Sequence, residues 1–338
     1  MLFFLIFYSN KFMFLSLIFM STLISVSSNS WLGMWLGLEI NLLSIIPLMN
    51  NIKNLFSSES SMKYFIVQAM ASSILLISII LMNSMEMNFQ SEMKNLIFTS
   101  ALLTKMGAAP FHFWFPEVME GLNWMISLIM LTWQKIAPMI ILSYLSWNIL
   151  IYMTIMFSVL IGGIMGLNQI SLRKIITYSS ITHMGWMIAA MMFNSTWIMY
   201  FIIYSFMSMI LIFILLKTKI YNINQMNNLF SKSKLMKISL SINFLSMGGL
   251  PPFIGFIPKW FTIQMLITNK LFLMSFIMIT STLITLYFYI RLIMPSITLN
   301  LNEIKMYFSL YKISFIMNWS NFLNMLGMIF CTMAYNII

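Results

Sequence analysis

Long apolar runs separated by polar connections make up almost the whole chain. A helix needs about 20 apolar residues to cross a bilayer, and the hydropathy pattern predicts eleven crossings, which span residues 3–24, 29–49, 63–83, 94–120, 122–145, 148–169, 172–192, 196–216, 237–268, 271–293 and 314–337. The connections are expected to be short except near 50–62, 217–236 and 294–313. The pattern therefore predicts an all-α polytopic membrane protein, with residues 1–338 in a single transmembrane domain.

Two of these segments, the fourth and the ninth, are interrupted by related motifs. MGAAPF at 106–111 resembles MGGLPPF at 247–253 when Met106 is aligned with Met247, and Pro116 and Pro258 follow the motifs. Proline removes a backbone donor and glycine relaxes the backbone, so both segments are expected to be discontinuous helices. Each is counted as one crossing. A simple proline kink is the alternative interpretation of each break.

The spacing of the two breaks indicates an internal repeat. They lie five crossings apart, so their helices are predicted to run in opposite directions, as in the inverted repeats of many ion transporters. The first half is expected over about 1–145 and the second over about 148–293, with a C-terminal helix at about 314–337. At the same offset, the crossing that contains Glu39 matches the one that contains His183.

Composition agrees with a membrane environment. The chain is 61% hydrophobic and 7% charged, whereas soluble domains carry about 25% charged residues, so too few charges are present for a water-facing surface. Basic residues outnumber acidic ones by 18 to 7. They do not cluster with stacking aromatics in a polar domain, however, so a nucleic-acid partner is not expected.

The basic residues predict an orientation. When connections are assigned alternately to two sides, the N-terminal side collects Lys53, Lys63, Arg173, Lys174, Lys217, Lys219, Lys232, Lys234, Lys237, Arg291, Lys305 and Lys312. The other side collects Lys94 and Lys270, and Lys11 lies within the first crossing. Basic loops stay on the side of synthesis. The abundance of Met and the absence of Asp are typical of an A/T-rich mitochondrial gene, so we expect the N-terminus in the matrix and the C-terminus in the intermembrane space.

Ionisable groups remain inside the apolar segments: Glu39, Lys105, Lys135, His183 and Lys259. A charge at mid-bilayer costs about 2.5–3.5 kcal/mol, so a pure scaffold would gain by replacing them with Leu. The alternative interpretations are a carboxyl that serves packing, lysines that snorkel to the interface and a packed core histidine. His112 follows a break and is a weaker candidate, because it could cap freed carbonyls.

These residue types suit proton transfer. Burial disfavours the charged form of a lysine and a nearby carboxylate favours it, so movement of the partner loads or releases a proton where water reaches the lysine. Histidine titrates near neutral pH and could act between lysines. The sequence has no Cys cluster, no Gly-rich nucleotide loop and no carboxylate–His metal set. Redox chemistry is therefore not expected in this chain itself.

At these residues the chain resembles the antiporter-like core subunits of mitochondrial respiratory complex I, the NADH:ubiquinone oxidoreductase, in an invertebrate, insect-like form. The matching stretches are SNSWLGMWLGLEINLLSIIPLM, SSMKYFIVQAMAS, ALLTKMGAAPFHFWFPEVMEGL, LTWQKIAP, GLNQISLRKIITYSSITHMGWM and MGGLPPFIGFIPKW. The resemblance covers most of residues 29–265. It implies that Glu39 and Lys105 form a coupling ion pair, that Lys135 is the central channel lysine and that Lys259 leads to the intermembrane side. His183 falls within the family's hydrophilic axis.

The resemblance also implies where the other parts lie. NADH, FMN, the Fe–S clusters and ubiquinone would be handled by other subunits, so no cofactor is expected in this chain. The expected partners are other membrane-arm subunits and inner-membrane phospholipids, including cardiolipin. Two competing interpretations remain on physical grounds: a stand-alone cation/proton antiporter, and a structural scaffold with vestigial charges.

Overall fold

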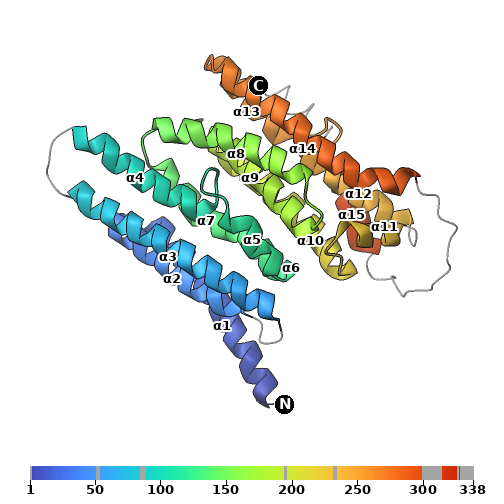
Figure 1. Cartoon of the computed structure of the whole chain (residues 1–338), viewed down its shortest axis with the longest axis horizontal. Helices are drawn as coiled ribbons and strands as arrows, with labels where there is room; N and C mark the ends of the chain where they lie inside the picture. The colour runs from blue at the N-terminus through green and yellow to red at the C-terminus, as the bar shows by residue number, and fades with distance from the viewer. Residues whose placement is uncertain are drawn as a thin grey trace. The chain divides into compact units, whose positions relative to one another are not determined.

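The computed structural model describes residues 2–50, 54–83, 89–193, 196–230, 234–298, 314–325 and 327, and nearly all of them are helical (Figure 1). Within these ranges, six helical segments are long and apolar enough to cross a membrane: Trp31–Met49, Leu55–Met82, Trp124–Ser143, Ile149–Leu167, Thr196–Thr218 and Phe272–Pro295. The predicted class, an all-helical multi-pass membrane protein, is confirmed.

The chain divides into two compact units, Met1–Thr154 and Ile155–Ile338. The first contains α1 (Leu2–Ser27), α2 (Trp31–Met49), α3 (Leu55–Asn83), α4 (Phe89–Met106), α5 (Trp114–Gly121), α6 (Trp124–Leu131) and α7 (Trp133–Ser143). Helix α2 packs against α1 and α3, and α4 packs against α3 and α7. Helix α8 (Ile149–Leu167) crosses the boundary between the units.

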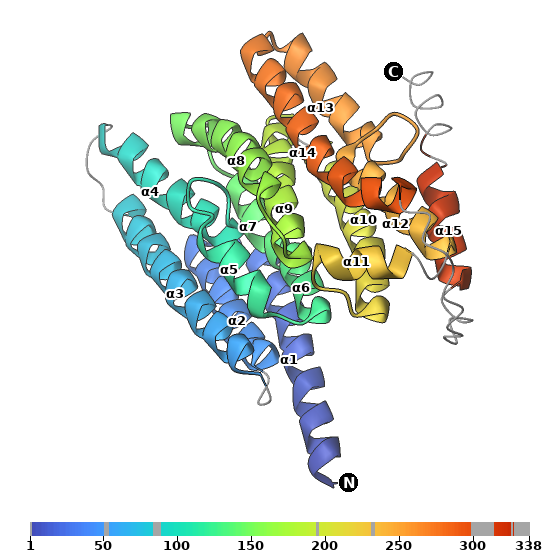
Figure 2. The same cartoon turned by 45° about the vertical axis from the view of Figure 1, so that its right-hand side comes forward.

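The second unit contains α9 (Leu172–Met191), α10 (Thr196–Thr218), α11 (Ile223–Phe230), α12 (Lys234–Gly248), α13 (Phe256–Thr268), α14 (Phe272–Thr298) and α15 (Ser314–Met325). Helix α9 packs against α10 and α13, and α12 packs against α10, α14 and α15 (Figure 2). Arg291 on α14 donates to the carbonyls of Leu167 and Gln169, where α8 ends. This side chain therefore fixes α14 to the end of α8.

Several helices differ from the sequence prediction. Helix α3 begins at Leu55, eight residues before the predicted start at 63. The serines in its first turns each donate to the carbonyl three residues earlier, which keeps this polar stretch helical. A short helix, α11, lies in the predicted connection 217–236. The predicted crossing 122–145 is divided at Thr132, and the last one, 314–337, extends beyond the described residues.

Glycine at position 121 lets α5 approach α3 closely. A Cβ placed there would lie 2.4 Å from the Phe56 carbonyl oxygen and 2.7 Å from Ser60 Cβ. We expect Gly121→Ala to destabilise the protein by about 1–3 kcal/mol, because backbone must move to make room. Gly163→Ala is the matched control, since its Cβ would meet nothing closer than 3.6 Å. Thermal unfolding of the two variants checks this, and an equal melting temperature for both would contradict it.

Candidate functional site

Lys105 lies one residue before the end of α4, at the first break. Gly107 follows the helix with φ of +70°, a backbone conformation that glycine adopts without strain. The carbonyls freed by the break are bound by side chains: Trp114 Nε1 donates to Thr104 O at 3.1 Å, and Gln68 Nε2 donates to Lys105 O at 3.3 Å. These freed carbonyls are therefore bound within the protein.

Lys135 lies in the first turn of α7, just after the break at Thr132. The Thr132 hydroxyl donates to Leu128 O at 2.8 Å, and the Lys135 amide donates to Thr132 O at 3.3 Å. Side-chain bonds of this kind compete with the helical ladder, and Pro138 lacks an N–H that would bind the carbonyl four residues earlier. Together they divide the crossing that hydropathy alone predicts to be continuous.

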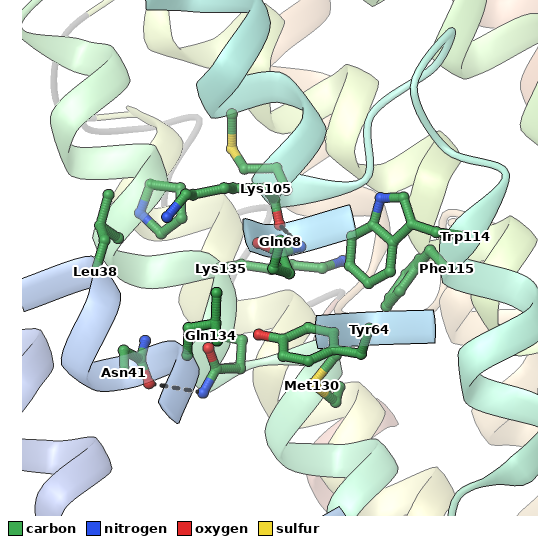
Figure 3. A pocket seen from close by; sticks show the side chains of 13 residues that line it. Leu38, Asn41, Tyr64, Gln68, Lys105, Trp114, Phe115, Met130, Gln134 and Lys135 are labelled. Carbon is green, nitrogen blue, oxygen red and sulfur yellow. Dashed lines mark hydrogen bonds between the residues drawn. The ribbon is translucent and has the colours of Figure 1, made fainter. Parts of the chain in front are cut away.

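Lys105 and Lys135 line the same cavity (Figure 3). Both are buried, with exposed fractions of 8% and 2%. In Figure 3, Lys105 points toward Leu38, whereas the Lys135 ammonium lies 5.5 Å from the centroid of the Phe115 ring. Neither lysine snorkels to the surface of this chain, so that alternative interpretation does not fit them.

Glu39 on α2 directly follows Leu38, a residue of the cavity wall. Its Oε1 atom is buried and has no hydrogen-bond partner among the side chains that the structure describes. Lys105 and Lys135 are thus brought together in the first unit, which also contains Glu39.

His183 is buried in the second unit, among aromatic side chains of α10. Its Nδ1 lies 2.9 Å from the Tyr200 hydroxyl, and its ring centroid lies 5.0 Å from that of Tyr204. Helix α9 carries buried hydroxyls next to the histidine, on Ser179, Ser180 and Thr182, which donate to carbonyls three residues earlier in the same helix. The surroundings of His183 are therefore polar within an apolar unit.

Lys259 on α13 lies at the second break and is 6% exposed. Its Nζ donates to the carbonyl oxygen of Gly248, the last residue of α12, at 2.8 Å. A cation at a helix C-terminus is stabilised by the partial negative charge there. Gly249 follows with φ of +79°, and a Cβ on it would lie 2.7 Å from Lys259 Cδ. The Lys259 ammonium group therefore binds the C-terminal end of α12.

The two breaks begin and end at corresponding residues. Helices α4 and α12 end at Met106 and Gly248, the positive-φ residues are Gly107 and Gly249, and α5 and α13 begin at Trp114 and Phe256. The alignment of Met106 with Met247 is therefore wrong by one residue. The reason is that the residue with positive φ marks the end of each helix, and that residue is Gly107 in the first break and Gly249 in the second.

The remaining candidate, His112, also lies in the first unit. His112 is buried and its Nδ1 lies 3.3 Å from the Pro110 carbonyl within the first break, as a capping side chain would. Hydropathy and charge did not single out Asn41, Tyr64, Gln68 or Gln134, which also line the cavity. The sequence could have identified them, because amides and hydroxyls inside apolar segments need hydrogen-bond partners just as charges do. In the described part of the chain, no group of three His, Cys, Asp or Glu could hold a metal.

Comparison with known proteins decides the family. Residues 28–285 match the family described as NADH:quinone oxidoreductase/Mrp antiporter, transmembrane. The chain belongs to this family. The matched range includes α2 to α13, and with them every residue proposed above for the site. The family resemblance seen in the sequence motifs is thereby confirmed.

Two insect relatives match over almost their full length. The protein named NADH-ubiquinone oxidoreductase chain 2 of Anopheles gambiae is 47% identical, over 97% of this chain and 98% of that protein. The protein of the same name from Aedes aegypti is 49% identical over 98% and 99%. A chain of respiratory complex I from Thermus thermophilus has the same fold, with a TM-score of 0.83, 20% identity and coverage of 94% of this chain and 78% of that one.

Proposed function

We propose that this chain is a proton-translocating core subunit of an NADH:ubiquinone oxidoreductase, respiratory complex I. The observation that carries the proposal is the near full-length similarity to insect proteins that are named chain 2 of that enzyme. Protons cross the membrane through buried side chains of this chain, while NADH, FMN, Fe–S clusters and ubiquinone are handled by other subunits. The redox reaction elsewhere in the complex drives the transfer.

Glu39, Lys105, Lys135, His183 and Lys259 form the proposed relay. Its first part is supported by the shared cavity of Lys105 and Lys135 and by the position of Glu39 directly after Leu38 of the cavity wall. In the second unit, burial of His183 and Lys259 supports their inclusion. Movement of Glu39 toward Lys105 would favour the protonated lysine, and its withdrawal would release the proton toward Lys135.

The proposed topology has eleven crossings that form two inverted halves, about 1–145 and 148–293, followed by a C-terminal helix at about 314–337. Support comes from the corresponding bounds of the two breaks, at Met106 and Trp114 in one half and at Gly248 and Phe256 in the other. The distribution of basic residues supports a matrix N-terminus and an intermembrane-space C-terminus in the mitochondrial inner membrane. The proposed partners are other membrane-arm subunits and phospholipids, including cardiolipin.

Purification under mild conditions separates this function from that of a stand-alone cation/proton antiporter. We expect the chain to co-purify with flavin- and Fe–S-containing subunits and with NADH:ubiquinone activity, because a full-length relative of a complex subunit carries the surfaces that bind its neighbours. Absorbance of flavin and Fe–S clusters in the fractions that contain the chain checks this. Recovery of the chain alone or as a small homo-oligomer, with sodium- or potassium-dependent proton exchange, would instead identify an antiporter.

A further inference from the structure

Two asparagines form a buried pair between α15 and α12, the helix that ends at the second break. Asn324 on α15 donates from Nδ2 to Asn243 Oδ1 on α12 at 2.6 Å, and the two helices pack together (Figure 2). The two residues are 0% and 1% exposed. Asn243 Nδ2 in turn donates to the Ser239 carbonyl on its own helix at 2.7 Å. The pair therefore joins α15 to α12 in the interior of the second unit.

This pair is a weak source of stability. The Asn324 Oδ1 atom is buried and has no hydrogen-bond partner within the described residues, and an unpaired buried acceptor is unfavourable. Two leucines of similar shape would pack at this place without that cost. A buried asparagine pair is better than an apolar contact at fixing the register of one helix on another. The pair therefore indicates that the position of α15 along α12 matters.

The register of α15 affects the second break directly. The backbone N–H of Ile254, in the segment between α12 and α13, donates to the Asn324 carbonyl oxygen at 3.3 Å. Gly327 approaches the same segment, where a Cβ on it would overlap the backbone of Phe253 and Ile254. Asn324 thus contacts α12 through its side chain and the break through its backbone.

The segment that Asn324 contacts leads to Lys259. Gly255 directly follows Ile254, and a Cβ on it would overlap the Ser246 carbonyl oxygen of α12, so the segment lies closely against this helix. Lys259 comes one turn later on α13, and its ammonium binds the end of α12. A shift of the segment around Ile254 would therefore move this ammonium relative to the helix end.

The corresponding position in the first unit is apolar. Asn243 lies six residues before the positive-φ residue Gly249. Six residues before Gly107 lies Ala101, which is 0% exposed. The asparagine of α12 therefore belongs to the break at which the lysine itself binds the helix end.

We propose that Asn324 and Asn243 are positioning residues that set the register of α15 on α12, and that α15 in this register holds the second break in the geometry that presents Lys259 to the end of α12. The asparagines carry no proton in the transfer, because neutral amides do not titrate at physiological pH. They act on Lys259 through the backbone of Ile254. This inference rests on the proposed function, in which Lys259 is a relay group.

The test uses the intact complex in proteoliposomes, with Asn324→Leu, Asn243→Leu and the double variant. Each single variant should lower the melting temperature, because it leaves the other amide buried without its partner. The double variant should recover most of this loss, because apolar groups of similar shape replace both partners. NADH-driven proton uptake should nevertheless stay at least about tenfold low in all three, because displacement of a reacting group by about 1 Å costs up to about a hundredfold.

Hydrogen exchange provides a second measurement. The Ile254 amide should exchange faster in all three variants, whereas the amides of α4, in the first unit, should exchange at their usual rates. Asn269→Leu is the matched control, because Asn269 caps the helix that carries Lys259 and its amide binds only the Met265 carbonyl of that helix among the bonds assigned to it. This control should pump at the normal rate.

The outcomes separate the inference from the proposed function. Normal uptake by the double variant, in an assay where Lys259→Met has lost pumping, overturns the inference and leaves the proposed function standing. Uptake that follows the melting temperature across the three variants identifies a purely structural role and also overturns it, as does unchanged exchange at Ile254. Normal uptake by Lys259→Met removes Lys259 from the relay and overturns both. Where Asn324→Leu does not assemble, Asn324→Ala tests the same bond, because it removes the amide without adding apolar bulk.

Discussion

Replacement of Lys135 by Met is expected to abolish the proton pumping that depends on this chain, while the complex remains assembled. Lys135 is 2% exposed and lines the cavity with Lys105, and Met has a similar length but cannot carry a proton. Positioned acid–base groups contribute about 10²- to 10⁴-fold to the rates of proton-transfer steps, so proton uptake by proteoliposomes should fall at least about a hundredfold. Removal of a buried ammonium also removes its desolvation cost, so the melting temperature should not fall.

The control for this variant is Lys237→Met, at the start of α12, which removes a lysine that does not line the cavity. It should pump at the normal rate. An assembled Lys135→Met complex with normal proton uptake would support the scaffold interpretation and remove Lys135 from the relay. Loss of assembly in Lys135→Met, with Lys237→Met intact, would show instead that the lysine has a structural partner.

The positions of most helices could be predicted because apolar length alone determines what fits a bilayer. The predicted segment 172–192 corresponds to α9 (Leu172–Met191), and 29–49 corresponds to α2 (Trp31–Met49). Hydropathy did not predict the division at Thr132, because the polar stretch 132–135 is short and has apolar residues on both sides. It depends on a hydroxyl bond to Leu128 and on Pro138, which act on the backbone and not on hydrophobicity.

The residue types predicted a relay of Glu39, Lys105 and Lys135, but they did not predict that Lys105 and Lys135 line one cavity. From sequence, each lies on a different helix, and the faces that meet depend on helix packing across the unit. The amides were missed for a related reason. Asn41, Gln68 and Gln134 carry no charge, so their cost in an apolar segment is smaller and they stand out less from the hydropathy pattern. Only their convergence on one cavity distinguishes them from ordinary polar residues.

The free carbonyl at each helix break is bound by a different kind of group, and this difference affects the proposed function. In the first, the neutral amide of Gln68 binds the freed carbonyl of Lys105, so the Lys105 ammonium is not needed as a cap. In the second, the Lys259 ammonium itself binds the Gly248 carbonyl. The proposed proton transfer at Lys259 would therefore be linked to the geometry of its break more closely than that at Lys105.

That linkage predicts that Lys259→Met lowers both stability and pumping. Without the ammonium, the buried Gly248 carbonyl loses its partner, which costs about 1–3 kcal/mol, and the charge that complements the end of α12 is lost. Proton uptake should also fall at least about a hundredfold, as expected for loss of a relay group. This combined effect separates Lys259→Met from Lys135→Met, which is expected to lose pumping alone. Thermal unfolding and proton uptake, measured on the same preparations, check both parts.

Substitutions at two neighbouring glycines separate the effect of the position of the Lys259 side chain from the effect of its charge. Gly249→Ala keeps the ammonium, but a Cβ at this positive-φ position would lie 2.7 Å from Lys259 Cδ and 2.9 Å from its Nζ, so we expect it to displace the side chain and lower stability and pumping together. Gly248→Ala is the matched control, because its Cβ would meet nothing closer than 3.7 Å. Normal pumping by Gly249→Ala would show that the contact of Lys259 with the end of α12 is dispensable. An unchanged melting temperature for Lys259→Met would show that the ammonium does not stabilise the break, and proton transfer at Lys259 would then be independent of the helix end.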